Sequence, residues 1–334
     1  MAVLFLFVSG VVFSDPLTVL TLAAWDGLTG SGLFVAKEYE EDEEREFRLD
    51  VMRSELKRLD ADLAVLTGLN GLPDLAESLS GELGYQGLYG INRGGLRIGV
   101  VGLPWNLREG SVMLARETLG FLPLDTKRFS GLFIKNTFSA GRKTSPQVMG
   151  GKIILAGRDV YVFSVEWTGT PGDPEEELSR LTGEYLSVRM EAGEFVKTLE
   201  TAVTGHEENL ATAYSTLGFI NSIAGDNPVI LSGSFNVLPG SREMEIMKRA
   251  GFQDAWEAGV GPGYTLDGSR NLNIQRFFDS PAVERQERLD YILYRGEGII
   301  VRDADLVFDT PTFGVHPSDR FGVYARFEIR PSSE

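Results

Sequence analysis

Short apolar runs bounded by glycine, asparagine or aspartate recur along the chain and predict β-strands. The expected strands cover residues 17–25, 63–69, 96–103, 152–157, 159–167, 228–235, 288–295 and 322–329. The link between 152–157 and 159–167 is very short and contains glycine, so these two strands must form an antiparallel hairpin. An all-parallel sheet is therefore excluded.

Two segments have the three-and-four residue spacing of an amphipathic helix. In the first, residues 47–60, the apolar face is Leu49, Met52, Leu56 and Leu59. In the second, residues 208–223, it is Leu210, Tyr214, Leu217 and Ile220. Each helix runs directly into an expected strand, so the pattern predicts an α/β protein in which helices cover mixed sheets.

Composition and charge restrict the classes of function. The chain has 334 residues, of which 43% are hydrophobic, enough for a continuous core. Its 32 Lys and Arg against 48 Asp and Glu leave a net charge of −16, which disfavours nucleic-acid binding. An acidic stretch at 37–48 is expected to be a solvated loop and helix start. The absence of cysteine excludes disulfides, thiolate metal sites and cysteine nucleophiles.

Residues 1–14, "MAVLFLFVSGVVFS", have the length of a signal-peptide core and are too short to span a bilayer. They lack a positively charged start. We expect an export signal at 1–14, a secreted or periplasmic protein, and a single domain over 15–334. A buried first strand or a misassigned start codon are the alternatives. No other segment reaches transmembrane length.

Five short motifs, in this order, resemble those of the endonuclease/exonuclease/phosphatase superfamily, and of its neutral-sphingomyelinase-like branch in particular. They are "TLAAWDGL" (21–28), "DLAVLTG" (62–68), "SVEW" (164–167), "GSFNVLP" (233–239) and "SDR" (318–320). Three further segments, 251–256, 261–273 and 287–295, resemble framework strings of the same family. The resemblance covers residues 17–329 and implies a DNase I-like, four-layer α/β sandwich of two packed mixed β-sheets flanked by helices. Fold alone does not assign a reaction.

The resemblance also implies a Mg²⁺ ion held mainly by a glutamate with an asparagine nearby, and a histidine that activates water. The Asp of the S-D-H motif orients that histidine, and other groups position the nucleophile. Five of the family's site residues are replaced in this chain and two are kept. The replaced positions are Ala23, Gly68, Glu166, Ser234 and Arg320, and the kept ones are Asn236 and Asp319.

The replacements remove the chemistry that the family uses. Ala23 and Gly68 offer no side-chain ligand to a cation, and Arg320 stays protonated and cannot act as a base. The two histidines do not compensate: His206 lies in an acidic segment, and His316 reaches the site only if the alignment shifts. We therefore assign no catalytic residue, no metal ligand and no cofactor.

The sequence predicts an inactive, exported pseudoenzyme that acts as a binding or assembly component with a protein or cell-envelope partner. The alternative is a metal-dependent phosphodiesterase or phospholipid hydrolase with a remodelled site, which alone would need Mg²⁺. Two hypotheses concern the emptied pocket: an ion pair between Arg320 and Glu166, or a new cation site formed by Asp26, Glu166 and Asp319.

A partner surface is expected after Trp25 and in the helical region between Glu175 and Ile223. The aromatic residues of these regions are expected in helix cores. They are Phe34, Tyr39, Tyr185, Phe195 and Tyr214.

Overall fold

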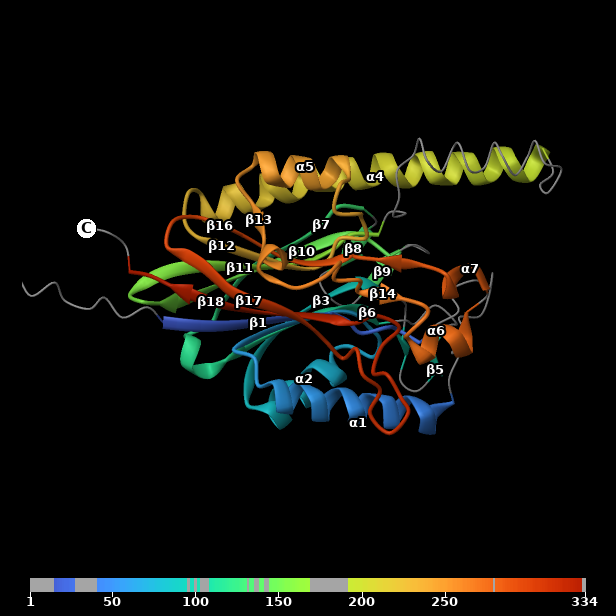
Figure 1. Cartoon of the computed structure of the whole chain (residues 1–334), viewed down its shortest axis with the longest axis horizontal. Helices are drawn as coiled ribbons and strands as arrows, with labels where there is room; N and C mark the ends of the chain where they lie inside the picture. The colour runs from blue at the N-terminus through green and yellow to red at the C-terminus, as the bar shows by residue number, and fades with distance from the viewer. Residues whose placement is uncertain are drawn as a thin grey trace, which may run out of the picture.

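The chain forms a sandwich of four layers, helix, sheet, sheet and helix, in a computed structural model (Figure 1). The structure describes residues 15–27, 41–94, 97–98, 101–102, 108–130, 132–134, 138–140, 144–168, 192–278 and 280–331. The predicted signal segment 1–14 lies outside them. The predicted α/β sandwich of two mixed sheets is confirmed.

The first sheet has six strands, and β1 and β2 pair in parallel whereas the other neighbours are antiparallel. Its spatial order is β17 (Ile299–Val307), β18 (Gly322–Ile329), β1 (Asp15–Ala23), β2 (Leu63–Leu69), β6 (Glu109–Arg116) and β3 (Tyr85–Arg93).

The second sheet also has six strands and one parallel pair, β11 with β12. Its order is β13 (Gln253–Asp254), β16 (Asp290–Arg295), β12 (Val229–Ser234), β11 (Arg158–Glu166), β10 (Gln147–Leu155) and β7 (Leu122–Arg128). The predicted hairpin is confirmed, because β10 and β11 pair antiparallel from Leu155 opposite Arg158 onward.

Six short strands form three small two-stranded sheets outside the sandwich. They are β4 (Arg97–Ile98) with β5 (Val101–Gly102), β8 (Leu132–Ile134) with β9 (Phe138–Ala140), and β14 (Leu266–Asp267) with β15 (Gln286–Glu287). The single strand predicted over 96–103 is wrong, since β4 and β5 pair with each other instead. The run contains two glycines, which weaken a strand interior.

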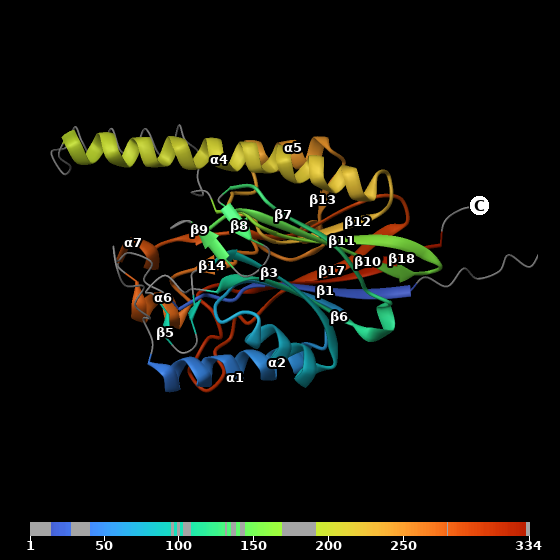
Figure 2. The same cartoon turned by 180° about the vertical axis from the view of Figure 1, so that it is seen from behind.

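Helices cover the outer face of each sheet, as Figures 1 and 2 show from opposite sides. The first sheet carries α1 (Asp42–Leu59) and α2 (Asp74–Leu83), and the second carries α4 (Ala192–Ala224) and α5 (Arg242–Arg249). Smaller helices are η1 (Glu117–Leu119), η2 (Ala255–Ala258), α6 (Leu272–Phe277) and α7 (Ser280–Val283). In the part of the chain described here, no helix combines the length and apolarity needed to cross a membrane.

The predicted face of α1 is confirmed, with Leu49, Met52 and Leu56 buried. On α4 the prediction is wrong for Tyr214, whose relative exposure is 64%. The buried face of α4 includes Ala213 and Thr216, so small and polar side chains pack where hydrophobicity alone pointed to the aromatic ring. The other aromatic residues named above lie outside the described residues or on a part of α4 whose side chains are not described.

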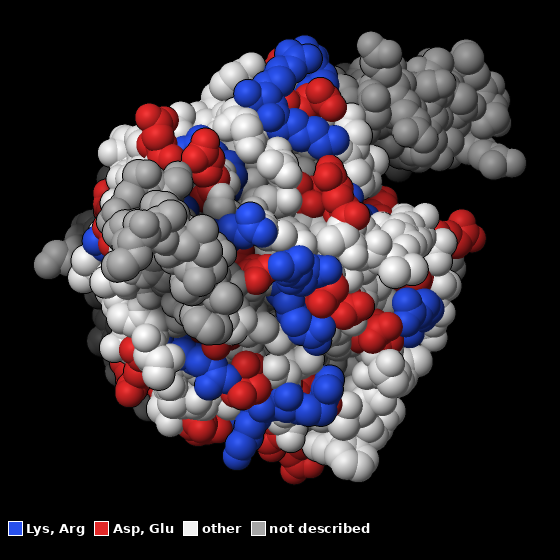
Figure 3. Space-filling view, turned by 60° about the vertical axis from the view of Figure 1, so that its left-hand side comes forward, with Lys and Arg blue, Asp and Glu red and all other residues white. Residues whose placement is uncertain are grey.

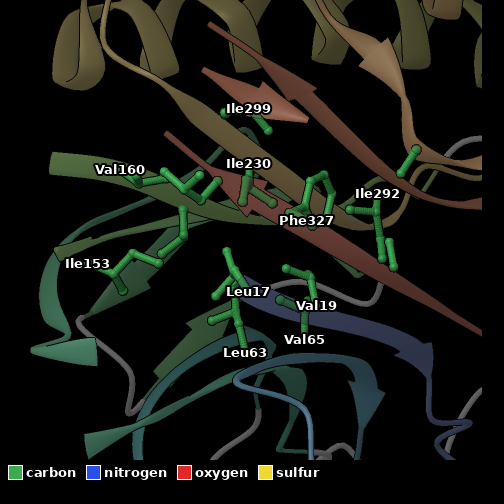
Figure 4. Packing of buried hydrophobic residues seen from close by; sticks show 14 of the residues in the cluster. Leu17, Val19, Leu63, Val65, Ile153, Val160, Ile230, Ile292, Ile299 and Phe327 are labelled. Atoms are coloured by element: carbon green, nitrogen blue, oxygen red, sulfur yellow. The ribbon is translucent and has the colours of Figure 1, made fainter. Parts of the chain in front are cut away.

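The core between the sheets explains where the site lies. Alternate residues of each strand point inward and form a layer that includes Leu17, Val65, Val160 and Ile292 (Figure 4). Further along the same strands the inward positions become polar and stay buried. Examples are Thr21, Thr67, Glu166, Ser234 and Asp290. One end of the sandwich interior is therefore built for polar chemistry.

Helix α5 begins with a side-chain N-cap. Ser241 is its N-cap, and its Oγ accepts a hydrogen bond from the Met244 N–H at 3.3 Å. Replacing Ser241 by alanine is expected to lower the free energy of unfolding by about 1 kcal/mol, because an orphan N–H loses its acceptor. Urea titration of the variant measures it, and replacement by glycine should cost only a few tenths of that amount.

Candidate functional site

The polar end of the sandwich interior is organised around a buried aspartate, Asp290, at the start of β16. Ser234 Oγ donates to Asp290 Oδ1 at 2.6 Å. Thr67 Oγ1 lies 2.7 Å from Ser234 Oγ, and it must donate, because the single proton of Ser234 is directed to Asp290. Since all three side chains are buried, this chain of hydrogen bonds joins β2 of the first sheet to β12 and β16 of the second.

The backbone around Ser234 is specified by its neighbours. Gly233 has φ 140°, and a Cβ there would lie 2.0 Å from the Val165 carbonyl oxygen of the parallel strand β11, so only glycine fits. Asn236 has φ 52°, a left-handed conformation that asparagine tolerates better than most residues. The Asn236 Nδ2 donates to the Trp167 carbonyl at 2.5 Å. The kept asparagine therefore has a structural reason to be there, independent of catalysis.

Arg320 fills the space in front of Asp290. Its Nη1 lies 3.1 Å from Asp290 Oδ2, and its Nη2 donates to Asn236 Oδ1 at 2.8 Å. The Asp290 side chain is fully buried and that of Arg320 is 16% exposed. The predicted ion pair between Arg320 and Glu166 is therefore wrong: the guanidinium turns to the carboxylate of β16, which the sequence analysis had not considered.

The electrostatics hold this arginine in its charged form. Burial acts to lower the pKa of Arg320, but Asp290 and Asp319 act more strongly in the opposite direction and raise it above its ordinary value. For Asp319, burial raises the pKa, although Arg320 beside it acts to lower it. A guanidinium in this setting cannot accept a proton from water.

The segment before Arg320 is anchored to the first strand. Ser318 Oγ donates to the Ala23 carbonyl, and the Arg320 N–H donates to Ser318 Oγ at 3.0 Å. His316 lies fully buried nearby, where its Nδ1 accepts from the Leu272 N–H at 3.1 Å at the start of α6. Burial lowers the pKa of His316. This histidine is thus a structural part of the α6 junction.

The two positions where the family would hold Mg²⁺ do not fit that ion. Ala23 has a methyl side chain, and Gly68 has φ 64°, a conformation that a glutamate would adopt only with strain. Among the described residues, no group of three or more His, Cys, Asp or Glu side chains is arranged to hold a metal ion. The hypothetical site of Asp26, Glu166 and Asp319 is therefore not formed.

Glu166 instead lies in a second polar cluster, with Glu109 of β6. Ser111 Oγ donates to Glu166 Oε2 at 2.5 Å, and the Gly68 N–H approaches the same oxygen at 3.5 Å. Burial raises the pKa of Glu166, and these donors, with Asn92, act to lower it. The net effect is that the pKa of Glu166 lies above the ordinary value of a glutamate.

The pKa of Glu109 is raised as well. Burial is the largest cause, followed by the charges of Asp26 and Glu166, and together they raise the pKa of Glu109 to about 8. Arg93 Nη1 at 3.4 Å from Glu109 Oε2 and a hydrogen bond from Thr144 act in the opposite direction but do not outweigh these causes. Glu109 is therefore largely a neutral acid at pH 7.

Comparisons with known proteins agree with this architecture. The model of the Endonuclease/Exonuclease/phosphatase family matches residues 195–319. A family protein from Bacteroides thetaiotaomicron shares the fold with a TM-score of 0.61 and 13% identity, covering 95% of this chain and 98% of that one. The family model matches less than half of the chain, and the solved structures share its fold at low sequence identity, so this chain is similar to the endonuclease/exonuclease/phosphatase family.

Other solved structures with the same fold are similarly distant in sequence. Humanized TDP2 from D. rerio has a TM-score of 0.58 and 15% identity, covering 93% of this chain and 98% of that one. D. rerio TDP2 complexed with single-strand DNA product has a TM-score of 0.59 and 15% identity, with 94% and 99% covered. A search of curated proteins finds no match. At this identity the likeness shows the fold alone.

Several residues of the site are not predicted by the sequence. Asp290 lies in the segment 287–295, which resembles a framework string of the family, although a lone aspartate at the start of an apolar strand is a usable signal. Glu109 and Ser111 lie on β6, and Gln147 lies on β10. Glycines and polar residues in these strands interrupt the apolar alternation that would indicate which side chains point inward. These residues lie close together because the two sheets pack face to face, and the spacing of residues along the chain does not predict this.

Proposed function

We propose that this protein is a noncatalytic member of the superfamily, of the neutral-sphingomyelinase-like branch, that acts by binding a partner. One observation carries the proposal: Arg320, at the position of the proton acceptor, is tied to Asp290 and Asn236. A group that cannot accept a proton gives no general-base catalysis, which is worth roughly 10² to 10⁴ in rate.

The metal positions support the same conclusion. Ala23 and Gly68 do not suit the Mg²⁺ that the fold family implies, and a lost metal removes several kcal/mol of transition-state stabilisation. Catalytic groups that act as a unit lose their effect together. Without the metal ligands and the proton acceptor, Asn236 and Asp319 are expected to give little rate enhancement.

The partner is proposed to be a protein or a component of the cell envelope. The apolar residues 1–14 favour export to the periplasm or the exterior. The net charge of −16 disfavours nucleic acid. On the face shown in Figure 3, Lys and Arg side chains lie among Asp and Glu side chains rather than in one extended basic area.

A second candidate is a phosphodiesterase or phospholipid hydrolase with a remodelled site. The observation that favours it is Glu109, which carries a proton near neutral pH and would suit a general acid. The match to the family model and the fold shared with a TDP2 complexed with single-strand DNA product are consistent with phosphodiester chemistry.

Turnover assays separate the two candidates. The purified protein, with Mg²⁺ or Mn²⁺, is tested on sphingomyelin, a chromogenic phosphodiester and DNA, and we expect no rate above that of buffer with metal. Metal-dependent turnover that is lost in Glu109→Gln or Glu166→Gln, but kept in the exposed control Glu245→Gln, would establish the hydrolase instead.

A further inference from the structure

His316 is fully buried where the segment before β18 meets the start of α6. Its Nδ1 accepts a hydrogen bond from the Leu272 N–H at 3.1 Å, so the neutral ring must carry its proton on Nε2. A second proton would have to bind Nδ1, where it would face the N–H donor of Leu272. Protonation of His316 and the hydrogen bond from Leu272 therefore exclude each other.

Two charged side chains of the described structure act on His316, namely Asp309 after β17 and Arg270 before α6. They form an ion pair at 2.6 Å, which neutralises much of the Asp309 charge that would otherwise attract an imidazolium. Burial is the largest cause and lowers the pKa of His316, the carbonyl and carboxylate of Asp309 act to raise it, and Arg270 acts to lower it. Since the net direction is downward, the folded protein keeps His316 neutral at pH 7.

Helix α6 depends on contacts with this segment for its stability. It has six residues, Leu272–Phe277, and a helix of this length is not stable without tertiary contacts. Asn271 Nδ2 donates to the Ser318 carbonyl at 3.0 Å. Asn273 Nδ2 donates to the His316 carbonyl at 2.9 Å. Together with the bond to His316 Nδ1, these contacts form the α6 junction.

The other end of α6 is held less firmly. Arg276 pairs with Glu44 of α1, but the two side chains are 60% and 41% exposed, so the pair contributes little. Phe277 packs on Trp25, with the ring centroids 5.4 Å apart. Trp25 lies two residues after Ala23, at the end of β1, and is buried. Loss of the α6 junction therefore frees the helix and uncovers an aromatic side chain beside the polar site.

We propose that the α6 junction is opened by acid: uptake of a proton from solvent by His316 Nδ1 breaks the bond from the Leu272 N–H, releases α6 and uncovers Trp25. The Arg320 N–H donates to Ser318 Oγ at 3.0 Å, so the release also loosens the backbone that positions Arg320. Deprotonation of His316 restores the junction. The protein thus presents different surfaces beside its polar site in neutral and in acid surroundings.

Hydrogen exchange of the full chain, followed by mass spectrometry and corrected for the intrinsic rate at each pH, tests the opening. Protection of the amides of residues 272–277 should fall on the order of 10-fold between about pH 7.5 and about pH 5.5. The reason is that the released imidazole titrates near 6.5 and the buried one at a lower pH. Protection of residues 229–234 in β12 should change by less than about 2-fold.

The chain has two histidines, so a variant of each assigns the effect. His316→Asn keeps an oxygen that can accept from the Leu272 N–H but cannot be protonated in this pH range. It is expected to fold and to keep the protection of residues 272–277 at acid pH. His206→Gln is the matched control and should lose this protection as the unmodified protein does.

Two further variants change the charges beside the ring at partly exposed positions, where folding is little affected. Arg270→Gln removes a repelling charge and frees Asp309, so the midpoint of the opening should move to higher pH by a few tenths of a unit. Asp309→Asn leaves Arg270 unpaired and should move the midpoint to lower pH by a similar amount. A purely structural histidine would not produce these opposite shifts.

Three results would overturn the proposal. The first is unchanged protection of residues 272–277 across this pH range in the unmodified protein. The second is the same loss in a folded His316→Asn, which would assign the opening to a carboxyl group. The third is an identical midpoint in Arg270→Gln and Asp309→Asn, which decides the matter independently of how well His316→Asn folds. No readout depends on turnover or on a partner, so this inference and the proposed function can fail separately.

Discussion

Replacing Arg320 by alanine is expected to lower the free energy of unfolding by about 3 to 5 kcal/mol. The reason is the effect on Asp290, which is fully buried and, among the described residues, would keep only the side-chain hydrogen bond from Ser234 after the guanidinium is removed. An ionised carboxylate without a cation is costly inside a protein, and protonating it costs free energy as well. Urea unfolding at pH 7, monitored by circular dichroism, measures the difference.

Arg326→Ala is the matched control. Arg326 pairs with Asp303, but its side chain is 54% exposed, so its removal should cost less than about 1 kcal/mol. The double variant Arg320→Met with Asp290→Leu should recover much of the loss, because no unpaired charge remains. A loss in Arg320→Ala no larger than that of the control would mean that the pair is solvated and does not fill the pocket.

Raising the pH is expected to lower the free energy of unfolding substantially. The native protein keeps a proton on Glu109 up to about pH 8, whereas the unfolded chain loses it near pH 4.5. Between these values the native state binds more protons, so stability is fully present below about pH 4.5 and is lost progressively as pH rises to about 8. The slope from this one group approaches about 1.4 kcal/mol per pH unit.

The raised pKa of Glu166 also makes the free energy of unfolding fall as the pH rises. The contribution of Glu109 must therefore be measured separately. Unfolding free energies of the unmodified protein and of Glu109→Gln are compared from pH 5 to pH 9 in EDTA. The variant should be more stable above neutral pH and should show a clearly smaller slope, since glutamine imitates the protonated acid. Parallel curves for the two proteins would show that Glu109 ionises normally, and Arg93 would then be its dominant neighbour.

Seven of the twelve strands in the two main sheets could be predicted from the sequence, because their signals are local. The strands β3, β6, β7, β13 and β17 were not predicted. The hairpin of β10 and β11 followed from a short link, and the buried face of α1 followed from residues spaced by three and four. The strand over 96–103 and the placement of Tyr214 were wrong for a common reason. Hydrophobicity shows which residues favour burial, but neighbouring elements decide which of them find room.

The site was predicted less completely than the fold. Alignment to short motifs located Ser234, Asn236 and Arg320, and the structure brings these three together around Asp290. The same motifs placed Glu166 next to Arg320, and the structure pairs it with Ser111 instead. Motif spacing orders residues along the chain, whereas the choice between two buried carboxylates depends on distances between strands from different sheets.

The sequence by itself determined the class of fold and the alternation of inward and outward residues along the strands it predicted. Each of these depends on residue identity or on short-range periodicity. Only the tertiary structure decided which carboxylate neutralises Arg320 and that Glu109 and Glu166 share one buried space. The energies of buried charges depend on distances and solvent exclusion, and these arise only when strands far apart in the chain are packed face to face.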